Sequence, residues 1–144
     1  MKLYSHTISL RIAHPSLDPA RVSDELGLKP HRSWKSGDPR STPQGTVLQG
    51  TYSEGYWAAD PFEYGWQSST DAQIEDSLEE LITLLEPHAV FLREITNGGI
   101  VRIWVDSQST RNYALELSPA MMQRLSSIGA TFVHDVYPSP QSEP

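Results

Sequence analysis

Residues 4–27 read YSHTISLRIAHPSLDPARVSDELG and contain two periodicities in succession. The first half alternates apolar and polar side chains, as in a strand with one buried face, and its apolar members are Ile8, Leu10 and Ile12. The second half begins with Asp18, which is suited to cap a helix, followed by a proline, and it ends with Gly27. We therefore predict a strand over 4–13 and a helix over 19–26.

Two further helices are indicated by the same signals. Over 71–86, isoleucine and leucine recur at helical spacing after the sequence Thr70-Asp71-Ala72-Gln73, which resembles a capping box, and Pro87 follows. A third helix is predicted over 119–128, between the Ser118-Pro119 pair and Gly129.

The remaining predicted strands are shorter. Residues 90–96 and 100–107 flank Asn97-Gly98-Gly99, and Asn-Gly favours a tight hairpin turn. Residues 46–48 and 56–59 each predict a short strand inside an irregular stretch over 28–70, and two more strands are predicted over 113–117 and 131–137.

The order of these elements predicts an α+β fold. Strand, capped helix and strand occur twice, and Leu17-Asp18-Pro19-Ala20 has a counterpart in Leu117-Ser118-Pro119-Ala120. We expect a two-layer sandwich of ferredoxin-like type, in which helices cover one face of a mainly antiparallel sheet. This repeated motif indicates either an internal duplication or, equally, similar helix-start chemistry at two places. The expected domain covers 1–137, and the tail 138–144 is expected to be disordered.

Several short motifs resemble the bacterial domain-of-unknown-function family 4279. They are Leu17-Asp18-Pro19, Leu26-Gly27-Leu28-Lys29-Pro30, Trp34-Lys35-Ser36-Gly37-Asp38, Trp57, and the closing Ile128-Gly129-Ala130 and Asp135-Val136-Tyr137. The resemblance covers roughly residues 6–137. It implies no established activity and no catalytic residues.

Composition narrows the class of protein. The chain has 144 residues and no cysteine, which excludes disulfides, thiolate metal sites and cysteine nucleophiles. No apolar run approaches the ~18 residues of a membrane span, and residues 1–6 lack the apolar core of a signal peptide. We therefore expect a cytoplasmic protein without contact to a membrane.

The charge is uneven along the chain. The net charge is −7, and residues 41–92 contain nine carboxylates but no lysine or arginine. Such a segment would attract a basic partner and repel a phosphate backbone, so we expect a protein partner rather than nucleic acid. The simpler alternative is a solvated acidic surface.

No motif for catalysis or for a cofactor is present. The five histidines show no close metal-binding spacing, and the chain has neither a nucleophile elbow nor a phosphate-binding glycine loop. We predict no catalytic residue, no metal and no cofactor, and expect that the protein is not an enzyme.

Three groups of residues are candidates for binding. Strand alternation places Arg11, Arg102, Trp104 and Glu116 on the sheet face away from the helices. Arg32 and Trp34 belong to a basic and aromatic loop, and Glu75 and Glu79 to the acidic segment. We expect Trp104 to be covered by the 52–66 segment, by a second subunit or by a ligand, because an indole fully in water would be unusual.

The function favoured by these observations is that of a non-catalytic binding module. The leading hypothesis is a bacterial immunity or accessory protein that masks a basic partner with the acidic segment over 54–86. One alternative is a small-ligand sensor or enzyme that uses the open sheet face. Another is a structural homodimer joined through that face.

Overall fold

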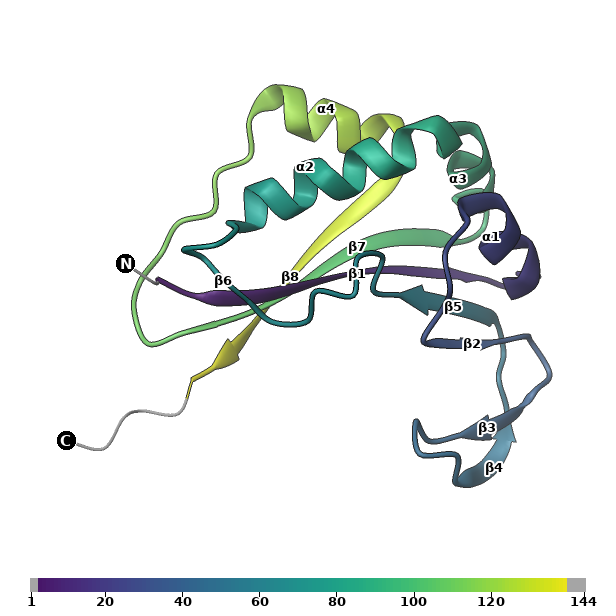
Figure 1. Cartoon of the computed structure of the whole chain (residues 1–144). Helices are drawn as coiled ribbons and strands as arrows, with labels where there is room; N and C mark the ends of the chain where they lie inside the picture. Colours follow the sequence, from purple (N-terminus) through teal and green to yellow (C-terminus); the bar gives the residue numbers. More distant parts are fainter. Residues whose placement is uncertain (1–2, 140–144) are drawn as a thin grey trace.

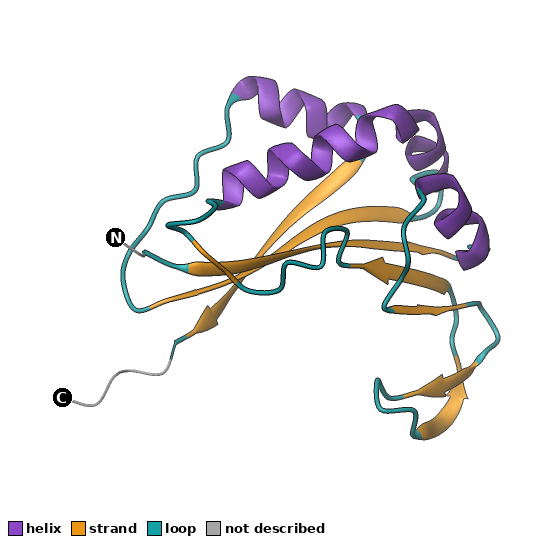
Figure 2. Cartoon of the chain, viewed as in Figure 1, coloured by secondary structure: helices purple, strands orange, loops and turns teal. Residues whose placement is uncertain are grey.

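The computed structural model describes residues 3–139 and places helices on one side of a mixed β-sheet (Figures 1 and 2). The helices are α1 (Pro19–Leu26), α2 (Ile74–Leu85), the 3-10 turn η1 (Glu86–His88), α3 (Ala89–Ile95) and α4 (Pro119–Ser127). The strands are β1 (Ser5–His14), β2 (Arg32–Trp34), β3 (Pro39–Ser41), β4 (Val47–Thr51), β5 (Gly55–Ala59), β6 (Gln67–Ser68), β7 (Ile100–Ser109) and β8 (Ala130–Pro138).

The main sheet has the order β2-β5-β1-β7-β8, and β6 pairs with β1 beyond the end of β5. All of its pairings are antiparallel except that of β7 with β8, which is parallel. The α+β class is therefore confirmed, with a mixed sheet. Neither the ferredoxin-like plan nor an internal duplication is confirmed by this order.

The strand β1 shows the predicted alternation. Leu10 and Ile12 are fully buried beneath the helices, whereas Ser9 and Arg11 are half-buried on the other face. The paired strand β7 repeats this pattern, with Val101, Ile103 and Val105 in the core. The helices thus cover one face and leave the other to solvent (Figure 2).

The two similar helix starts, those of α1 and α4, have the predicted capping chemistry. The side chain of Asp18 accepts a hydrogen bond from the Ala20 N–H, and that of Ser118 accepts one from the Met121 N–H. The strand after α1 is β2, which pairs with β5 and therefore runs parallel to β1 with β5 between them. The strand after α4 is β8, which pairs directly with β7 in parallel. Similar caps therefore start both helices, but the two helices join strands at different separations in the sheet.

The predicted hairpin over 90–107 is wrong in its first half. Residues 89–95 form α3, because Phe91, Leu92 and Ile95 also fit one face of a helix, and all three are buried. The two glycines turn the chain from α3 into β7. Gly98 has a φ of +90°, and a Cβ on Gly99 would lie 2.5 Å from the Ala13 carbonyl oxygen.

The predicted strand over 113–117 is also wrong. These residues form an irregular connection between β7 and α4, in which Tyr113, Leu115 and Leu117 pack against the core. Of the predicted tail 138–144, residues 140–144 lie outside the described residues, and Pro138 ends β8. In the described part, no helix combines the length and the apolar character needed to cross a membrane.

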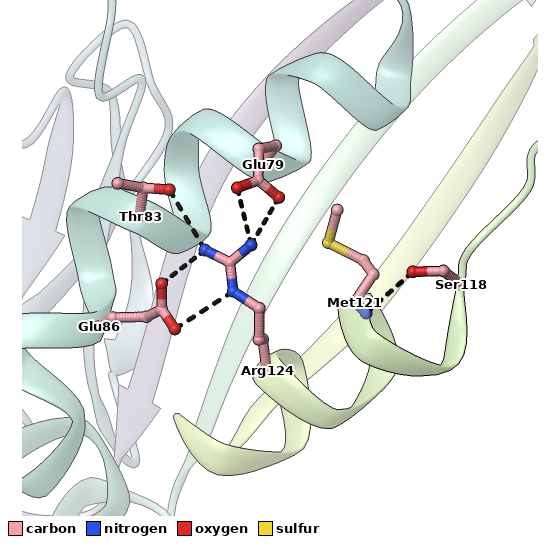
Figure 3. A network of polar contacts seen from close by, with 6 residues as sticks. All are labelled: Glu79, Thr83, Glu86, Ser118, Met121 and Arg124. Carbon is pink, nitrogen blue, oxygen red and sulfur yellow. Dashed lines mark hydrogen bonds and ion pairs between the residues drawn. The ribbon is translucent and has the colours of Figure 1, made fainter.

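A charged clamp joins α2 to α4 (Figure 3). The Arg124 guanidinium on α4 donates to both carboxylate oxygens of Glu79, at 2.7 and 2.6 Å, and to Glu86, at 2.5 and 3.2 Å. It also donates to the Thr83 hydroxyl. The hydrogen bond from Arg124 lowers the pKa of Glu86. One arginine thus fixes the packing of two helices in the upper layer.

A polar pair lies within the apolar core, between α2 and β1. His6 is fully buried, and its Nε2 lies 2.8 Å from the Ser77 hydroxyl, while its Nδ1 has no partner. Burial lowers the pKa of His6, because a charged imidazole there would lose its hydration. The neutral ring is therefore the form that the folded core accepts.

This pair predicts that stability depends on pH. The contribution of neutral His6 to the free energy of unfolding is complete above pH 6.5, the usual pKa of histidine, because His6 is then neutral in the unfolded chain as well. Below that value the unfolded chain binds the proton more readily, so the free energy of unfolding falls until the pH reaches the lowered pKa. We expect His6→Gln, which keeps a polar partner for Ser77, to reduce this pH dependence in urea titrations. The exposed His31→Gln should leave the dependence unchanged, and an equal reduction in both variants would contradict the assignment.

Candidate functional site

Three arginines lie in one row on the face of the sheet that the helices leave open. Arg32 on β2 and Arg11 on β1 are both aligned with Ala58 of β5, and Arg11 is aligned with Arg102 of β7. Residues aligned across strands point to the same side of a sheet. We call this surface, defined by Arg32, Arg11 and Arg102, the arginine face.

Within residues 3–139, none of these arginines forms an ion pair with a carboxylate. The Nε of Arg11 donates to the Ser9 hydroxyl at 3.2 Å, and an Nη of Arg32 donates to the Ser41 carbonyl at 2.7 Å. Arg11 and Arg102 are directly opposite each other, an arrangement in which like charges destabilise a sheet. The face therefore carries positive charge that the fold does not neutralise by pairing.

Trp104 lies beside this row, as predicted, and is half-buried. The Arg11 guanidinium lies over its ring, 4.1 Å from the centroid, and its Nε1 donates to Asp106 at 2.9 Å. The cover is thus a cation–π contact from the neighbouring strand. In the described residues, no ring of the 52–66 segment stacks on Trp104, although Trp66 of that segment lines the same groove as Arg11 and Asp106.

Arg32 and Trp34 form a second arginine–tryptophan pair at the β2 end of the row. Trp34 stacks on Tyr52 and on Tyr56, with centroids 3.9 and 4.5 Å apart, and Arg32 lies over its ring. Tyr52 precedes β5, next to the β3–β4 hairpin, which projects from the sheet on the side opposite the helices (Figure 1). The structure thus brings Arg32 and Trp34 of the predicted loop onto the same face as Arg11 and Trp104.

A groove of about 640 Å³ borders this face, between β1 and the loop that joins β5 to β6. Its lining carries charges of both signs on a partly apolar surface and comprises Thr7, Ser9, Arg11, His31, Asp60, Glu63, Trp66 and Asp106 among others. Glu63 has a φ of +57°, and its N–H donates to the Asp60 side chain at 3.0 Å. A residue with a side chain is strained in this left-handed conformation, and such strain is often found at functional sites.

Glu116, Glu75 and Glu79 do not join the arginine face. Glu116 is exposed on the irregular connection before α4, because the strand predicted for it does not form. Glu79 binds Arg124 in the clamp, and Glu75 is half-buried with one carboxylate oxygen that lacks a partner. Of these two candidate residues, Glu79 is exposed but already paired, because the packing of α4 against α2 uses it.

Sequence analysis missed a hydroxyl–imidazole cluster on the helix side of the sheet. The Ser107 hydroxyl lies 2.7 Å from Nε2 of His134, and the Tyr113 hydroxyl contacts both. Burial lowers the pKa of His134, so the folded protein favours its neutral ring. Ser107, however, is fully buried and cannot meet a substrate, so the cluster does not form a nucleophilic site. Strand alternation and the parallel pairing of β7 with β8 were the signals needed to find it.

No metal site is formed by the described part of the chain, where no three histidine, aspartate or glutamate side chains gather. His134 lies on the helix side of β8, with Ser107, whereas its neighbour Asp135 is aligned with Asp106 on the open face. This divergence was expected for adjacent residues of a strand.

Comparison with known proteins identifies a family but no function. A family model described as Domain of unknown function (DUF4279) matches residues 3–139, in agreement with the resemblance found in the sequence. No curated protein and no solved structure matches the chain significantly.

The clamp predicts the effect of reversing the charge of Glu79. Glu79→Lys places a cation beside Arg124, so we expect a lower melting temperature and faster amide hydrogen exchange in α4. The matched control is Asp71→Lys, which makes the same change in charge at an exposed position before α2. Equal melting temperatures for the two variants would show that the clamp does not stabilise the protein.

The strained conformation of Glu63 predicts a stabilising substitution. Glycine adopts a positive φ without the steric cost of a Cβ, so Glu63→Gly should raise the free energy of unfolding by about 0.5–1 kcal/mol. Asp71→Gly is the control, because the φ of Asp71 is not positive. The extra backbone freedom of glycine should therefore lower stability at that position. Chemical denaturation measures both, and a loss of stability in Glu63→Gly would contradict the assigned strain.

Proposed function

Because the chain belongs to the family described as Domain of unknown function (DUF4279), which implies no activity, we propose a function from its own surface. We propose a non-catalytic module that binds a protein partner through the arginine face. The single observation that supports this proposal is the row of three arginines without carboxylate partners on the sheet face that no helix covers.

The composition of the face supports a protein partner. Arginine and tryptophan are the residues that most often dominate the energy of protein interfaces, and the face has two pairs of them, Arg11 with Trp104 and Arg32 with Trp34. In both pairs the guanidinium lies against an indole, so the long arginine side chain loses less freedom on binding. The face is therefore partly ordered before a partner arrives.

The masking of a basic partner by the acidic segment is a weaker proposal than its composition indicates. Several of its carboxylates act within the fold: Asp76 accepts from the Gln73 N–H, Glu80 accepts from the Tyr64 hydroxyl, and Glu79 and Glu86 hold Arg124. What remains of the immunity or accessory hypothesis is the general role of a small binding protein, with the opposite charge at the contact.

The groove beside β1 supports a second candidate, a sensor for a small ligand. Its volume of about 640 Å³ lies in the range of small-molecule pockets, and its lining includes Arg11 together with Asp60 and Asp106. A ligand with both charges would match this lining. The proposal of a protein partner is favoured because the arginine row extends from β2 across β5 and β1 to β7 and reaches beyond the groove.

A crosslinking experiment tests the protein partner. A photoreactive amino acid replaces Thr131 of β8, which is aligned with Arg102 of β7. In the native host it captures proteins that contact the arginine face. The captured partner is then purified, and its affinity is measured by calorimetry. We expect Arg11→Ala/Arg102→Ala to weaken binding at least tenfold, since each charge-assisted hydrogen bond contributes about 1.5–3 kcal/mol.

The matched control removes two arginines from the helix layer. Arg21→Ala/Arg93→Ala gives the same change in net charge and should leave affinity unchanged. If both double variants weakened binding of the partner equally, the change in net charge alone would explain the effect. That result would contradict the proposed face. Capture of the chain by itself, with a dimeric mass in light scattering, would favour the structural homodimer instead.

A further inference from the structure

The arginine face also indicates the chemistry of its partner, an inference that rests on the proposed function. We propose that the occupant is an extended acidic segment of the partner protein, lying across the strands with carboxylates on alternate residues along the arginine row. The length of the row, its unpaired charge and its flanking residues each support this occupant.

The length of the row fits five residues of extended chain. Arg32 on β2 and Arg102 on β7 are three strand spacings apart, with β5 and β1 between them. Three spacings amount to about 14 Å. In an extended segment, side chains two residues apart point the same way, and residues i and i+4 are about 13.5 Å apart. Carboxylates at i, i+2 and i+4 therefore span the whole row, whereas a single small anion reaches only part of it.

The unpaired charge fits carboxylates. A guanidinium has five N–H donors. Arg11 donates one hydrogen bond within the fold, to Ser9. Arg32 donates from a single Nη to the Ser41 carbonyl and to the Tyr52 hydroxyl. The donors that remain suit two-pronged binding of carboxylates. A carboxylate between Arg11 and Arg102 would also offset the repulsion between these opposed residues.

The flanking residues restrict where the segment lies. Asp106 is aligned with Thr7 on β1 and Asp135 on β8, so an acidic row runs across the same face four residues along β7 from the arginine row. Trp104 separates the two rows, in line with Ser9 and Val133. An acidic segment displaced toward the aspartates would be repelled, so the two rows together fix its position.

Single-stranded nucleic acid fits the face less well than an acidic peptide. Base stacking needs free aromatic faces, but Trp34 stacks on two tyrosines and the Trp104 ring is covered by Arg11. The net charge of −7 would in addition repel a long chain of phosphates. A short acidic segment crosses the face with few charges outside the arginine row.

The test uses two synthetic peptides that differ only in charge. Acetyl-Glu-Ser-Glu-Ser-Glu-amide and its counterpart with glutamine in place of each glutamate are titrated into the isotope-labelled full chain at low salt. The measured signals are the NMR shifts of the arginine Nε–H groups and the tryptophan Nε1–H groups. We expect saturable shifts at Arg11, Arg32, Arg102 and Trp104 with the glutamate peptide, and an affinity at least tenfold lower for the glutamine peptide.

Three outcomes would overturn the inference: no saturable shift with the glutamate peptide, equal affinity for both peptides, or tighter binding of a five-nucleotide thymidine oligonucleotide. Arg11→Gln/Arg102→Gln should abolish saturation, while Arg21→Gln/Arg93→Gln should not, and the spectra themselves report whether each variant is folded. If the peptide fails while partner capture still depends on the arginine face, only the acidic segment is refuted. If both fail, the binding face itself is refuted.

Discussion

The pairing of β1 along both of its edges determines the rest of the structure. One edge bonds to β7 and the other to β5 and β6, so β1 cannot rotate without breaking three sets of hydrogen bonds. Because its apolar side chains are then held beneath the helices, its polar ones must project from the opposite face. The burial of Leu10 and the position of Arg11 are thus two results of one constraint, which links stability to the candidate site.

The parts of the fold that were predictable are those with local signals. Helices α1 and α4 were found because a side-chain cap and a proline mark their starts, and α2 because its leucines repeat at helical spacing. The α3 segment was mistaken for a strand, since Phe91, Leu92 and Ile95 are compatible with either period in so short a run. The parallel pairing of β7 with β8 has no local signal at all, because it depends on how α4 returns the chain to the sheet.

The same distinction holds for the site. Alternation along single strands correctly placed Arg11, Arg102 and Trp104 on the open face, since the period of a strand is a local property. The alignment of Arg32 with Arg11 required the register of β2 and β5, which the sequence does not encode in any short pattern. The pairing of Glu79 was missed for a similar reason, because its partner Arg124 comes from a helix far along the chain. Long-range partners decide which charges remain free.

The long separation between β1 and β7 has a consequence for the order of folding during synthesis. Ser5 pairs with Gln108 and Ala13 with Ile100, so β1 leaves the ribosome well before β7, which fills its second edge. Until then β1, β5 and the first helices expose apolar surface and an unpaired edge, the features that promote aggregation of nascent chains. Arg11, next to two buried neighbours in that strand, then acts as a charged gatekeeper, and the same guanidinium later contributes to the binding face.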